Sequence, residues 1–322
     1  MKKLIIHITY ILFAFASLTL LAQNEALKGY RIEGDEVVFS FDKRDYKKAT
    51  NDAAGFKRDF DDLDIENVVV SGEFNNWSKD KWTMTKLNDD VYELRKKLVD
   101  FTDEFSWEFK FVINNTFWAE PSKYDLNTIK ATKDGHKFGN VYNLKMYTAH
   151  PSDSGNAVFK LKGYKNAKKV ILSGTFNRWD EHLFEMKKTD EGWELKLQLK
   201  PDEYEYRFIV DGNWMEDPDN IDKVENEFGE YNSHLDIKEY TAFKLRGYLE
   251  AKEVILAGTF NDWNEHEYKM SKTDYGWKFV VPLSGGKHHY KFIVDGEWIV
   301  DPNNTVKEYD DNGNINSVCM VK

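Results

Sequence analysis

Tryptophan recurs at two kinds of turn along this chain of 322 residues. Trp179 and Trp263 each follow Phe-Asn-x at the end of a strand-like run, and Trp214 and Trp298 each follow Asp-Gly-x. A large aromatic side chain is costly to leave in water at a turn. Each ring therefore either folds back over the edge of its own domain as structural cover or offers a flat apolar surface to a ligand.

Polar residues at constant positions favour the ligand interpretation. Arg207 and Lys291 lie on the outward face of the strand that leads to the second Trp, and Asn232 and Asn316 lie on the last strand after a glycine turn. A sugar ring has an apolar C–H face and a rim of hydroxyls, so it requires aromatic planes with a few donor and acceptor groups. Two Trp, one cation and one Asn meet that requirement.

These residues recur because the chain is built from repeats. The run V-I-L-S-G-T-F-N-R-W, which ends at Trp179, returns 84 residues later as V-I-L-A-G-T-F-N-D-W, which ends at Trp263. The two copies align without a gap, and nearly half of their positions are identical. A more divergent copy, V-V-V-S-G-E-F-N-N-W, ends at Trp77. Repeats at such a period predict tandem domains, here three.

The divergent copy keeps only part of the pattern. Lys110 takes the position of the cation. The Asp-Gly turn has become the longer N-N-T-F-W, so that either Phe117 or Trp118 could fill the second aromatic position. Tyr142, with Asn143 beside it, stands at the position of the asparagine. Ligand binding by this copy is therefore a separate question.

Two lysines and a long apolar run, Leu4 to Leu21, open the chain, as in an export signal. An uncleaved membrane anchor is the competing interpretation, although His7, Thr9 and Tyr10 dilute the run. We expect export to a periplasm, a cell surface or the medium, with no membrane span in the mature chain. The predicted segments are an export signal at 1–22, a first domain at 23–147, a polar linker at 148–155, a second domain at 156–238 and a third at 239–322.

The first domain carries an insert at about 42–67 that the other two lack. Most of its residues are charged, which is typical of a solvated loop. The alternative is a flap over a ligand. Tyr46, Phe56 and Phe60 keep that alternative open.

Inside each copy the hydrophobic pattern is that of β-strands. In W-E-L-K-L-Q-L, which begins at Trp193, apolar and polar residues alternate, as expected of a half-buried antiparallel strand. Turn signals recur every few residues, which predicts an all-β fold of two-sheet sandwiches. Trp193, Trp277 and Tyr92 each lead such an alternation and are predicted to lie in the core.

Composition excludes several classes of partner. The net charge is −11, and we find no basic cluster of the kind that nucleic acid or an anionic membrane requires. The single cysteine, Cys319, rules out an intrachain disulfide and is expected to be a buried small hydrophobic residue.

Nothing in the sequence indicates catalysis, a cofactor or a metal. A glycosidase needs two carboxylates in a cleft, but the repeated acidic residues stand in Asp-Gly and Asp-Pro turns, where we expect them to serve turn structure: Asp211, Asp217, Asp295 and Asp301. The adjacent His288 and His289 point to opposite faces of a strand, which is poor ligand geometry. The run 310–314 is expected to be a plain turn and only secondarily a weak Ca²⁺ loop.

Taken together, the quoted turns and the G-x-x-N-S run resemble carbohydrate-binding module family 48, which includes the glycogen-binding domain of the AMP-activated protein kinase β subunit. The resemblance implies early-set immunoglobulin-like β-sandwiches that bind α-1,4-linked glucan such as glycogen or starch. It places the stacking tryptophans, the cation and the asparagine on the following positions: Trp179, Trp214, Arg207 and Asn232; Trp263, Trp298, Lys291 and Asn316; and, incompletely, Trp77, Trp118 and Lys110.

The leading hypothesis is a secreted, non-catalytic protein that binds α-glucan through paired Trp on tandem modules. One rival is a structural or protein-interaction array of immunoglobulin-like domains that has kept the fold and lost sugar binding. It predicts that the turn tryptophans are buried against their own domain. A second rival is a subunit that targets a separate amylase, or another glycoside hydrolase, to its substrate.

Overall fold

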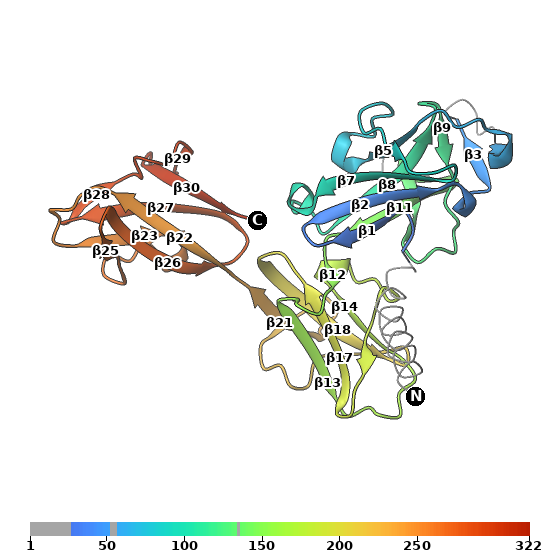
Figure 1. Ribbon diagram of the computed structural model, residues 1–322. Coiled ribbons are helices and arrows are strands. Elements are labelled where there is room, and N and C mark those ends of the chain that lie inside the picture. Colours follow the sequence, from blue (N-terminus) through green and yellow to red (C-terminus); the bar gives the residue numbers. More distant parts are fainter. Residues whose placement is uncertain (1–26, 52–56, 134–135) are drawn as a thin grey trace, which may run out of the picture. The chain divides into compact units, whose positions relative to one another are not determined.

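The computed structural model describes residues 27–51, 57–133 and 136–322. The predicted export signal and Phe56 lie outside these ranges. Strands joined by turns and short 3₁₀ helices make up this part of the chain, and they form three pairs of sheets (Figure 1). The predicted all-β sandwich class is confirmed.

The first sheet pair combines a four-stranded sheet, in the order β1-β2-β7-β6, with a larger sheet in the order β10-β11-β8-β9-β3-β4, in which β5 also pairs with β8. Its elements are β1 (Tyr30–Glu33), β2 (Glu36–Asp42), η1 (Lys43–Asp45), β3 (Lys48–Thr50), β4 (Lys57–Asp59), η2 (Phe60–Asp62), β5 (Val68–Gly72), η3 (Glu73–Asn75), β6 (Thr85–Lys86), β7 (Val91–Lys97), η4 (Leu98–Phe101), β8 (Ser106–Ile113), β9 (Phe117–Ala119), β10 (Thr128–Lys133) and β11 (His136–Tyr147).

The second sheet pair places β13 and β16 on either side of β17, and in its other sheet β18 pairs with β14, β19 and β21, which in turn pairs with β20. Its elements are β12 (His150–Pro151), β13 (Ala157–Lys162), β14 (Val170–Gly174), η5 (Thr175–Asn177), β15 (Phe184–Glu185), β16 (Lys187–Lys188), β17 (Gly192–Gln198), β18 (Asp202–Val210), β19 (Asn213–Met215), β20 (Lys223–Glu225) and β21 (Tyr231–Ile237).

The third sheet pair has a sheet in the order β22-β26-β25 and a sheet in the order β24-β23-β27-β30-β29, with β28 on β27. Its elements are β22 (Glu239–Arg246), β23 (Val254–Gly258), η6 (Thr259–Asn261), β24 (Tyr268–Lys269), β25 (Ser271–Thr273), β26 (Gly276–Leu283), β27 (Gly286–Val294), β28 (Glu297–Ile299), β29 (Lys307–Tyr309) and β30 (Ile315–Val321).

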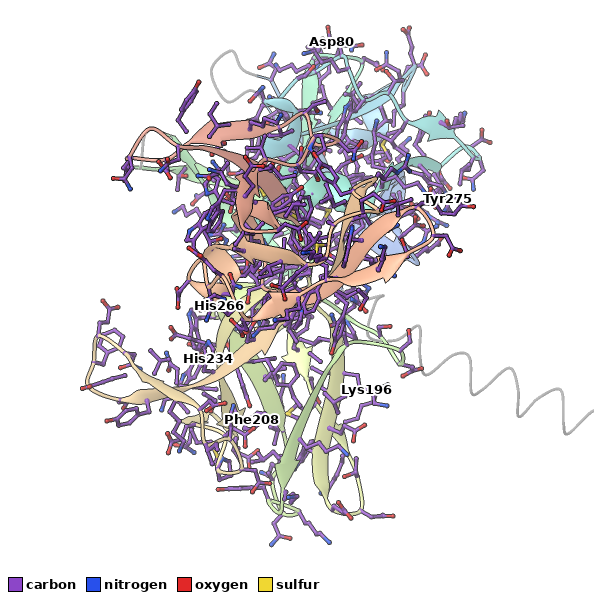
Figure 2. All side chains as sticks on the ribbon, turned by 90° about the vertical axis from the view of Figure 1, so that its left-hand side faces the viewer. Asp80, Lys196, Phe208, His234, His266 and Tyr275 are labelled. Atoms are coloured by element: carbon purple, nitrogen blue, oxygen red, sulfur yellow. The ribbon has the colours of Figure 1, made fainter. Side chains whose placement is uncertain are left out.

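The core of each pair lies between its two sheets and follows the period-two pattern. Trp193, Trp277 and Tyr92 are buried there as predicted. The indole N–H of Trp193 donates to the carbonyl oxygen of Tyr164 at 3.1 Å, so that its one polar atom is satisfied. Burial differs sharply between Phe208, on β18, which is fully buried, and the turn residue Tyr275, which is 83% exposed. Both residues are labelled in Figure 2.

The described part of the insert at 42–67 is more regular than the solvated loop that its charge suggested, although most of its charged side chains are exposed. It forms η1, β3, β4 and η2, and β3 pairs with β9, so that it extends a sheet. Tyr46 and Phe60 are buried in the core of the first sheet pair, and the Tyr46 ring stacks on Phe41 at 5.1 Å between ring centroids. The charged residues suggested a solvated loop, but these two aromatics anchor the insert to the core.

A buried polar network explains the repeated Asp-Pro turn. In the third sheet pair the Tyr290 hydroxyl donates to Asp301 Oδ2 at 2.7 Å, and the Ser317 hydroxyl accepts from the Asp301 N–H at 2.8 Å. The Asn304 amide donates to the Tyr290 hydroxyl and to the Val318 carbonyl. The same contacts join Tyr206, Asp217, Ser233 and Asn220 in the second pair. The predicted structural role of these aspartates is confirmed.

Candidate functional site

The Phe-Asn-x-Trp turn holds its tryptophan in a strained but fixed backbone. Trp263 and the preceding Asp262 both have φ in the left-handed region, at 58° and 50°. Residues other than glycine adopt that region only where the surroundings impose it. Here Asn261 imposes it, because its Oδ1 accepts the N–H of Gly258 at 2.9 Å while the Trp263 N–H donates to the Gly258 carbonyl at 2.9 Å.

Gly258 is required for a different reason. A Cβ at this position would lie 2.5 Å from the carbonyl oxygen of His289 on the neighbouring strand. The turn can therefore press against β27 only with glycine at this point. Trp77 and Trp179 have the same left-handed backbone, with φ of 54° and 59°, so the turn is common to all three tryptophans.

The second tryptophan is set by a tight hairpin. Asp295 and Gly296 both have positive φ, which is the geometry of a two-residue type I′ turn. The Asp295 carboxylate accepts hydrogen bonds from the backbone N–H groups of Lys252 and Glu253 at 2.9 and 3.0 Å. It therefore connects the hairpin to the residues directly before β23. The turn role predicted for this aspartate is confirmed, and Asp211 does the same in the second sheet pair. Strand pairing then places Trp298 opposite Ile293.

In the third sheet pair these elements converge on one open cleft of about 500 Å³. The four residues that the sequence pattern singles out for this copy all line it: Trp263, Lys291, Trp298 and Asn316. The two indole rings lie 6.2 Å apart at 47°, and Trp298 is 38% exposed. Trp263 also packs on the cluster of Ile255, Ala257 and Ile293, so the structural-cover interpretation holds in part for this ring, while its ligand role stays a prediction.

The turn 310–314 completes the cleft and was missed as part of the site. Asp310, Asn312 and Asn314 line it as well. Asp310 Oδ1 accepts the backbone N–H groups of Asn312 and Asn314, and its Oδ2 accepts the amide of Asn316 at 3.3 Å. The backbone N–H of Asn314 is the main reason that the pKa of Asp310 is lowered. The carboxylate thus organises a plain turn, as predicted, and places two amides in the cleft.

The second sheet pair repeats this framework with different chemistry at the tip. Arg207 lies 6.0 Å from the Trp214 ring centroid, and the Asn232 amide donates to Glu205 Oε2 at 2.7 Å. Phe228, which is 80% exposed, stands 84 residues before Asn312 and so at the corresponding position of the hairpin. An exposed aromatic at a Gly turn is the signal that could have identified it.

In the first sheet pair, strand register settles two open assignments. Trp118 lies opposite Val112, two residues after Lys110, just as Trp298 lies opposite Ile293, two residues after Lys291. Trp118 rather than Phe117 therefore takes the second aromatic position. Its ring lies 6.2 Å from that of Trp77, at 69°.

Asn143, not Tyr142, stands in the first sheet pair where Asn232 stands in the second. Leu144 pairs with Phe109 as Ser233 pairs with Tyr206, so that the residue before each is equivalent. The contact confirms the register, because the Asn143 amide donates to Glu108 Oε2 at 2.8 Å, as Asn232 does to Glu205. Asn143 follows Trp118 by 25 residues, whereas Asn232 follows Trp214 by 18, so counting along the sequence could not fix this register.

Lys110 occupies the predicted position, but it is enclosed. Its ammonium donates to Glu120 Oε1 at 2.8 Å, and the side chain is only 5% exposed. The Thr50 hydroxyl, from β3 of the insert, donates to the same Glu120 oxygen at 2.5 Å. Burial lowers the pKa of Lys110, even though Glu120 favours its charged form. In addition, the Lys79 ammonium lies 4.9 Å from the Trp118 ring centroid.

Comparison with known families gives this geometry a context. The model for the glycogen recognition site of AMP-activated protein kinase matches residues 157–244 and again 240–322, together more than half of the chain. The chain belongs to this family. The two matches coincide with the second and third sheet pairs, which supports the resemblance drawn from the tryptophan turns.

Individual relatives match one copy of this glycogen recognition module. The beta-1 subunit of 5′-AMP-activated protein kinase from Sus scrofa is 34% identical over 82 residues, which cover 26% of this chain and 63% of that sequence. The beta-2 subunit from Mus musculus is 37% identical over 71 residues, 22% of this chain and 26% of that sequence. The chain thus spans under two thirds of the curated relatives it matches.

Solved structures with a partial likeness include a maltogenic amylase from S. marinus, at 22% identity and TM-score 0.22, covering 51% of this chain and 28% of that one. A pullulanase from Bacillus acidopullulyticus is 14% identical with TM-score 0.20, covering 91% and 36%. At these TM-scores the likeness carries no argument. Within the described ranges no helix is long and apolar enough to cross a membrane, and no group of three metal-ligating side chains was found.

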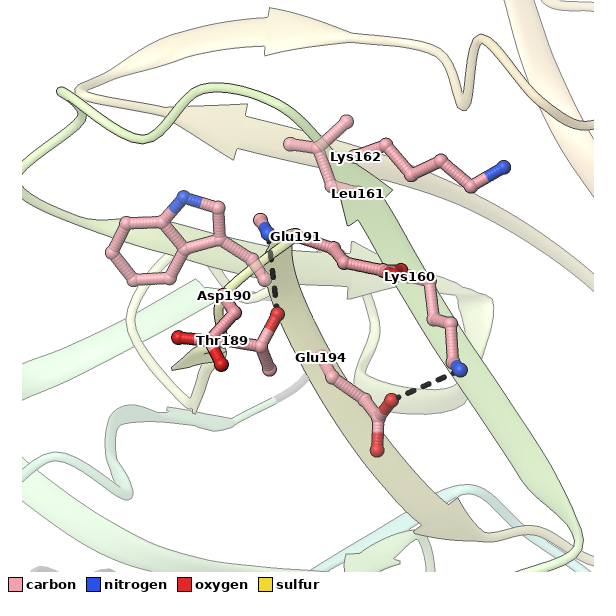
Figure 3. Close-up of a pocket in the computed structure, with 9 residues that line it drawn as sticks. Lys160, Leu161, Lys162, Thr189, Asp190, Glu191 and Glu194 are labelled. Carbon is pink, nitrogen blue, oxygen red and sulfur yellow. Dashed lines mark hydrogen bonds and ion pairs between the residues drawn. The ribbon is translucent and has the colours of Figure 1, made fainter.

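A second hollow, of about 310 Å³, is lined by residues of β13, of β17 and of the turn before β17 (Figure 3). Its lining is mostly charged, and Lys160 pairs with Glu194 across it at 3.2 Å. The one aromatic residue in the lining, Trp193, is buried. This hollow therefore lacks the exposed ring that distinguishes the cleft of the glycogen recognition modules.

Proposed function

We propose that this protein is an exported, non-catalytic protein that binds α-glucan such as glycogen or starch. The observation that carries the proposal is the cleft of the third sheet pair, which is lined by Trp263, Lys291, Trp298 and Asn316. The repeat pattern alone singles out these four residues for their fit to a sugar ring, and the fold brings all four to one cleft. Membership of the glycogen recognition family supports the same ligand class.

The cleft has the means to bind a glucose unit. The indoles offer apolar planes to the C–H faces of the sugar, while the Lys291 ammonium and the amides of Asn312, Asn314 and Asn316 offer hydrogen bonds to hydroxyls. If each ring covers about 100 Å² of sugar at about 25 cal/mol/Å², the gross gain is about 5 kcal/mol. After the costs of association, this corresponds to affinities of roughly millimolar to tens of micromolar per module.

We also propose that the first sheet pair is a third, divergent copy of the module. The supporting observations are the register of Trp118 and the contact between Asn143 and Glu108. Export is proposed from residues 1–22, and N-terminal sequencing of the protein from the producing cell tests it: a mature chain that begins near Gln23 is expected.

The proposal that the protein is non-catalytic rests on its carboxylates. Asp217 and Asp301, which each stand three residues after the second Trp, are buried in the tyrosine and serine network. They are thus unavailable as an acid and base pair. Incubation with maltoheptaose should release no shorter sugars. A glycoside hydrolase partner stays a prediction, for which co-precipitation from the producing cell is the direct check.

The deciding experiment is retention of the mature protein on glycogen, starch and cellulose, with maltoheptaose as competitor. We expect retention on glycogen and starch but not on cellulose, and loss of retention with the competitor. An absence of retention on all three polymers would refute the proposal and favour the structural or protein-interaction array.

A further inference from the structure

The cation of the site has a different partner in each sheet pair. In the third pair, the Lys291 side chain lines the cleft, and its ammonium forms no hydrogen bond or ion pair with any residue in the described part of the chain. In the second pair, an Arg207 guanidinium nitrogen donates to Glu230 Oε2. In the first pair, Lys110 donates to Glu120. A cation that already has a carboxylate partner is less available to a sugar hydroxyl.

The difference between the second and third pairs comes from one hairpin position. Glu230 and Asn314 are 84 residues apart, at the same place before the last strand. Asn314 is neutral, and its side chain is held by Asp310, which leaves Lys291 to the cleft. Glu230 instead reaches Arg207, whose side chain is only 14% exposed. Glu230 itself is 58% exposed, so the pair can open, and the expected effect is a weakening of binding rather than a block.

In the first pair the cation is sealed. Lys110 and Glu120 are both nearly buried, and the Thr50 hydroxyl of β3 occupies the same carboxylate oxygen. Pairing of β3 with β9 brings the insert to the edge of the sheet beside Trp118. Releasing Lys110 toward a ligand would leave Glu120 unpaired in a nearly dry environment, which is strongly unfavourable.

We propose that the three copies form a graded series, in which the third sheet pair is the principal α-glucan site, the second is a weaker one and the first does not bind α-glucan. This inference rests on the proposed function and assigns it to particular domains. The controlling residues are Asn314, Glu230 and Glu120, which decide whether the site cation is free, paired or sealed.

Reciprocal variants of the full chain test the second and third sites. Trp214→Ala weakens the second site, so that the Kd of the third can be measured, and Trp298→Ala does the reverse. Isothermal titration with maltoheptaose gives the Kd in each variant. We expect the third site to bind at least about threefold more tightly. Glu230→Gln should tighten the second site by about threefold, and Asn314→Glu should weaken the third by a similar factor.

Controls separate charge from shape. Asn314→Gln has nearly the size of Asn314→Glu without its charge, and should leave the third site within about twofold of its starting affinity. Glu227→Asn removes a charge from the same turn as Glu230, and should not change the second site. Melting curves identify any variant that has lost its fold, and Glu230→Gln remains informative if Asn314→Glu proves unstable.

The first site is tested with Trp214→Ala and Trp298→Ala combined, for which we expect only residual maltoheptaose binding, at least about tenfold weaker than that of the unmodified third site. Binding by this double variant that disappears on adding Trp118→Ala would overturn the assignment. The assignment would also be overturned if the second site bound maltoheptaose as tightly as the third. The same holds if Glu230→Gln and Asn314→Glu left both affinities unchanged. If the unmodified chain binds no α-glucan at all, it is the proposed function that fails and not the ranking.

Discussion

Replacing Trp298 by alanine gives the sharpest test of the cleft, because the two tryptophans differ in what else they support. Trp263 packs on Ile255 and Ile293, so its removal would also cost stability. Trp298 is 38% exposed on the three-residue edge strand β28 and faces the cleft. Trp298→Ala should therefore remove an exposed ring while leaving the sandwich intact.

The magnitude follows from the area that a sugar would cover. About 100 Å² of contact at about 25 cal/mol/Å² amounts to about 2.5 kcal/mol, which is an upper bound of roughly 70-fold in Kd. Since part of this gain is lost to ordering and imperfect polar contacts, we expect a weakening of tenfold or more. Titration of the full chain with maltoheptaose should show it as the loss of one binding event.

Tyr275→Ala is the matched control. Tyr275 is an 83% exposed aromatic residue at the turn between β25 and β26, and it is not part of the cleft lining (Figure 2). Its removal should leave affinity and the number of binding events unchanged. If Trp298→Ala binds as well as Tyr275→Ala, or if it melts several degrees earlier, then the ring is structural cover and the argument from the cleft is refuted.

Three further outcomes are expected. Tyr290→Phe leaves Asp301 without its buried donor and should lower the free energy of unfolding by about 1–3 kcal/mol, measured by urea titration, with glucan binding unchanged. Glu120→Gln should lower the free energy of unfolding by about 3 kcal/mol, because it leaves Lys110 buried without a counter-charge. The double variant Lys110→Met with Glu120→Leu should regain most of that stability. Because the pKa of Asp310 is lowered, its carboxylate stabilises the 310–314 turn fully above the ordinary pKa of 3.8. This stabilisation is lost as the pH falls below that value. Binding by the third site should therefore hold from pH 7 to about pH 4 and decline below, as fluorescence titration would detect.

The fold was predictable because strands such as β13 and β17 have one apolar face. Period two alone identified the cores around Trp193 and Trp277, and the repeat located the turns. Residue chemistry also identified residues that line the third cleft, since a large aromatic residue at a turn is costly to leave in water. Asp217 and Asp301 were correctly assigned to turn structure for the same local reason.

What the sequence did not reveal depends on contacts between distant segments. The charge-rich insert suggested solvent exposure, yet Tyr46 and Phe60 pack in the core, because two apolar side chains are enough to fix a short hairpin. The register of Asn143 depends on strand pairing across a turn of altered length. The pairing of Lys110 with Glu120 depends on an edge strand that only the insert supplies.

The cleft lies on the outer face of its sheet and draws nothing from the core between the sheets, which explains how the copies could diverge. Positions that shape the backbone keep their role in the second and third sheet pairs, because Asp211 and Asp295 each tie a hairpin to a strand entry. The hairpin tips differ between the two copies, with Glu230 in one and Asn314 in the other. If the second and third sites both bind one glucan polymer, as proposed, sites of unequal affinity would still reinforce each other, because the first contact raises the effective concentration of the next.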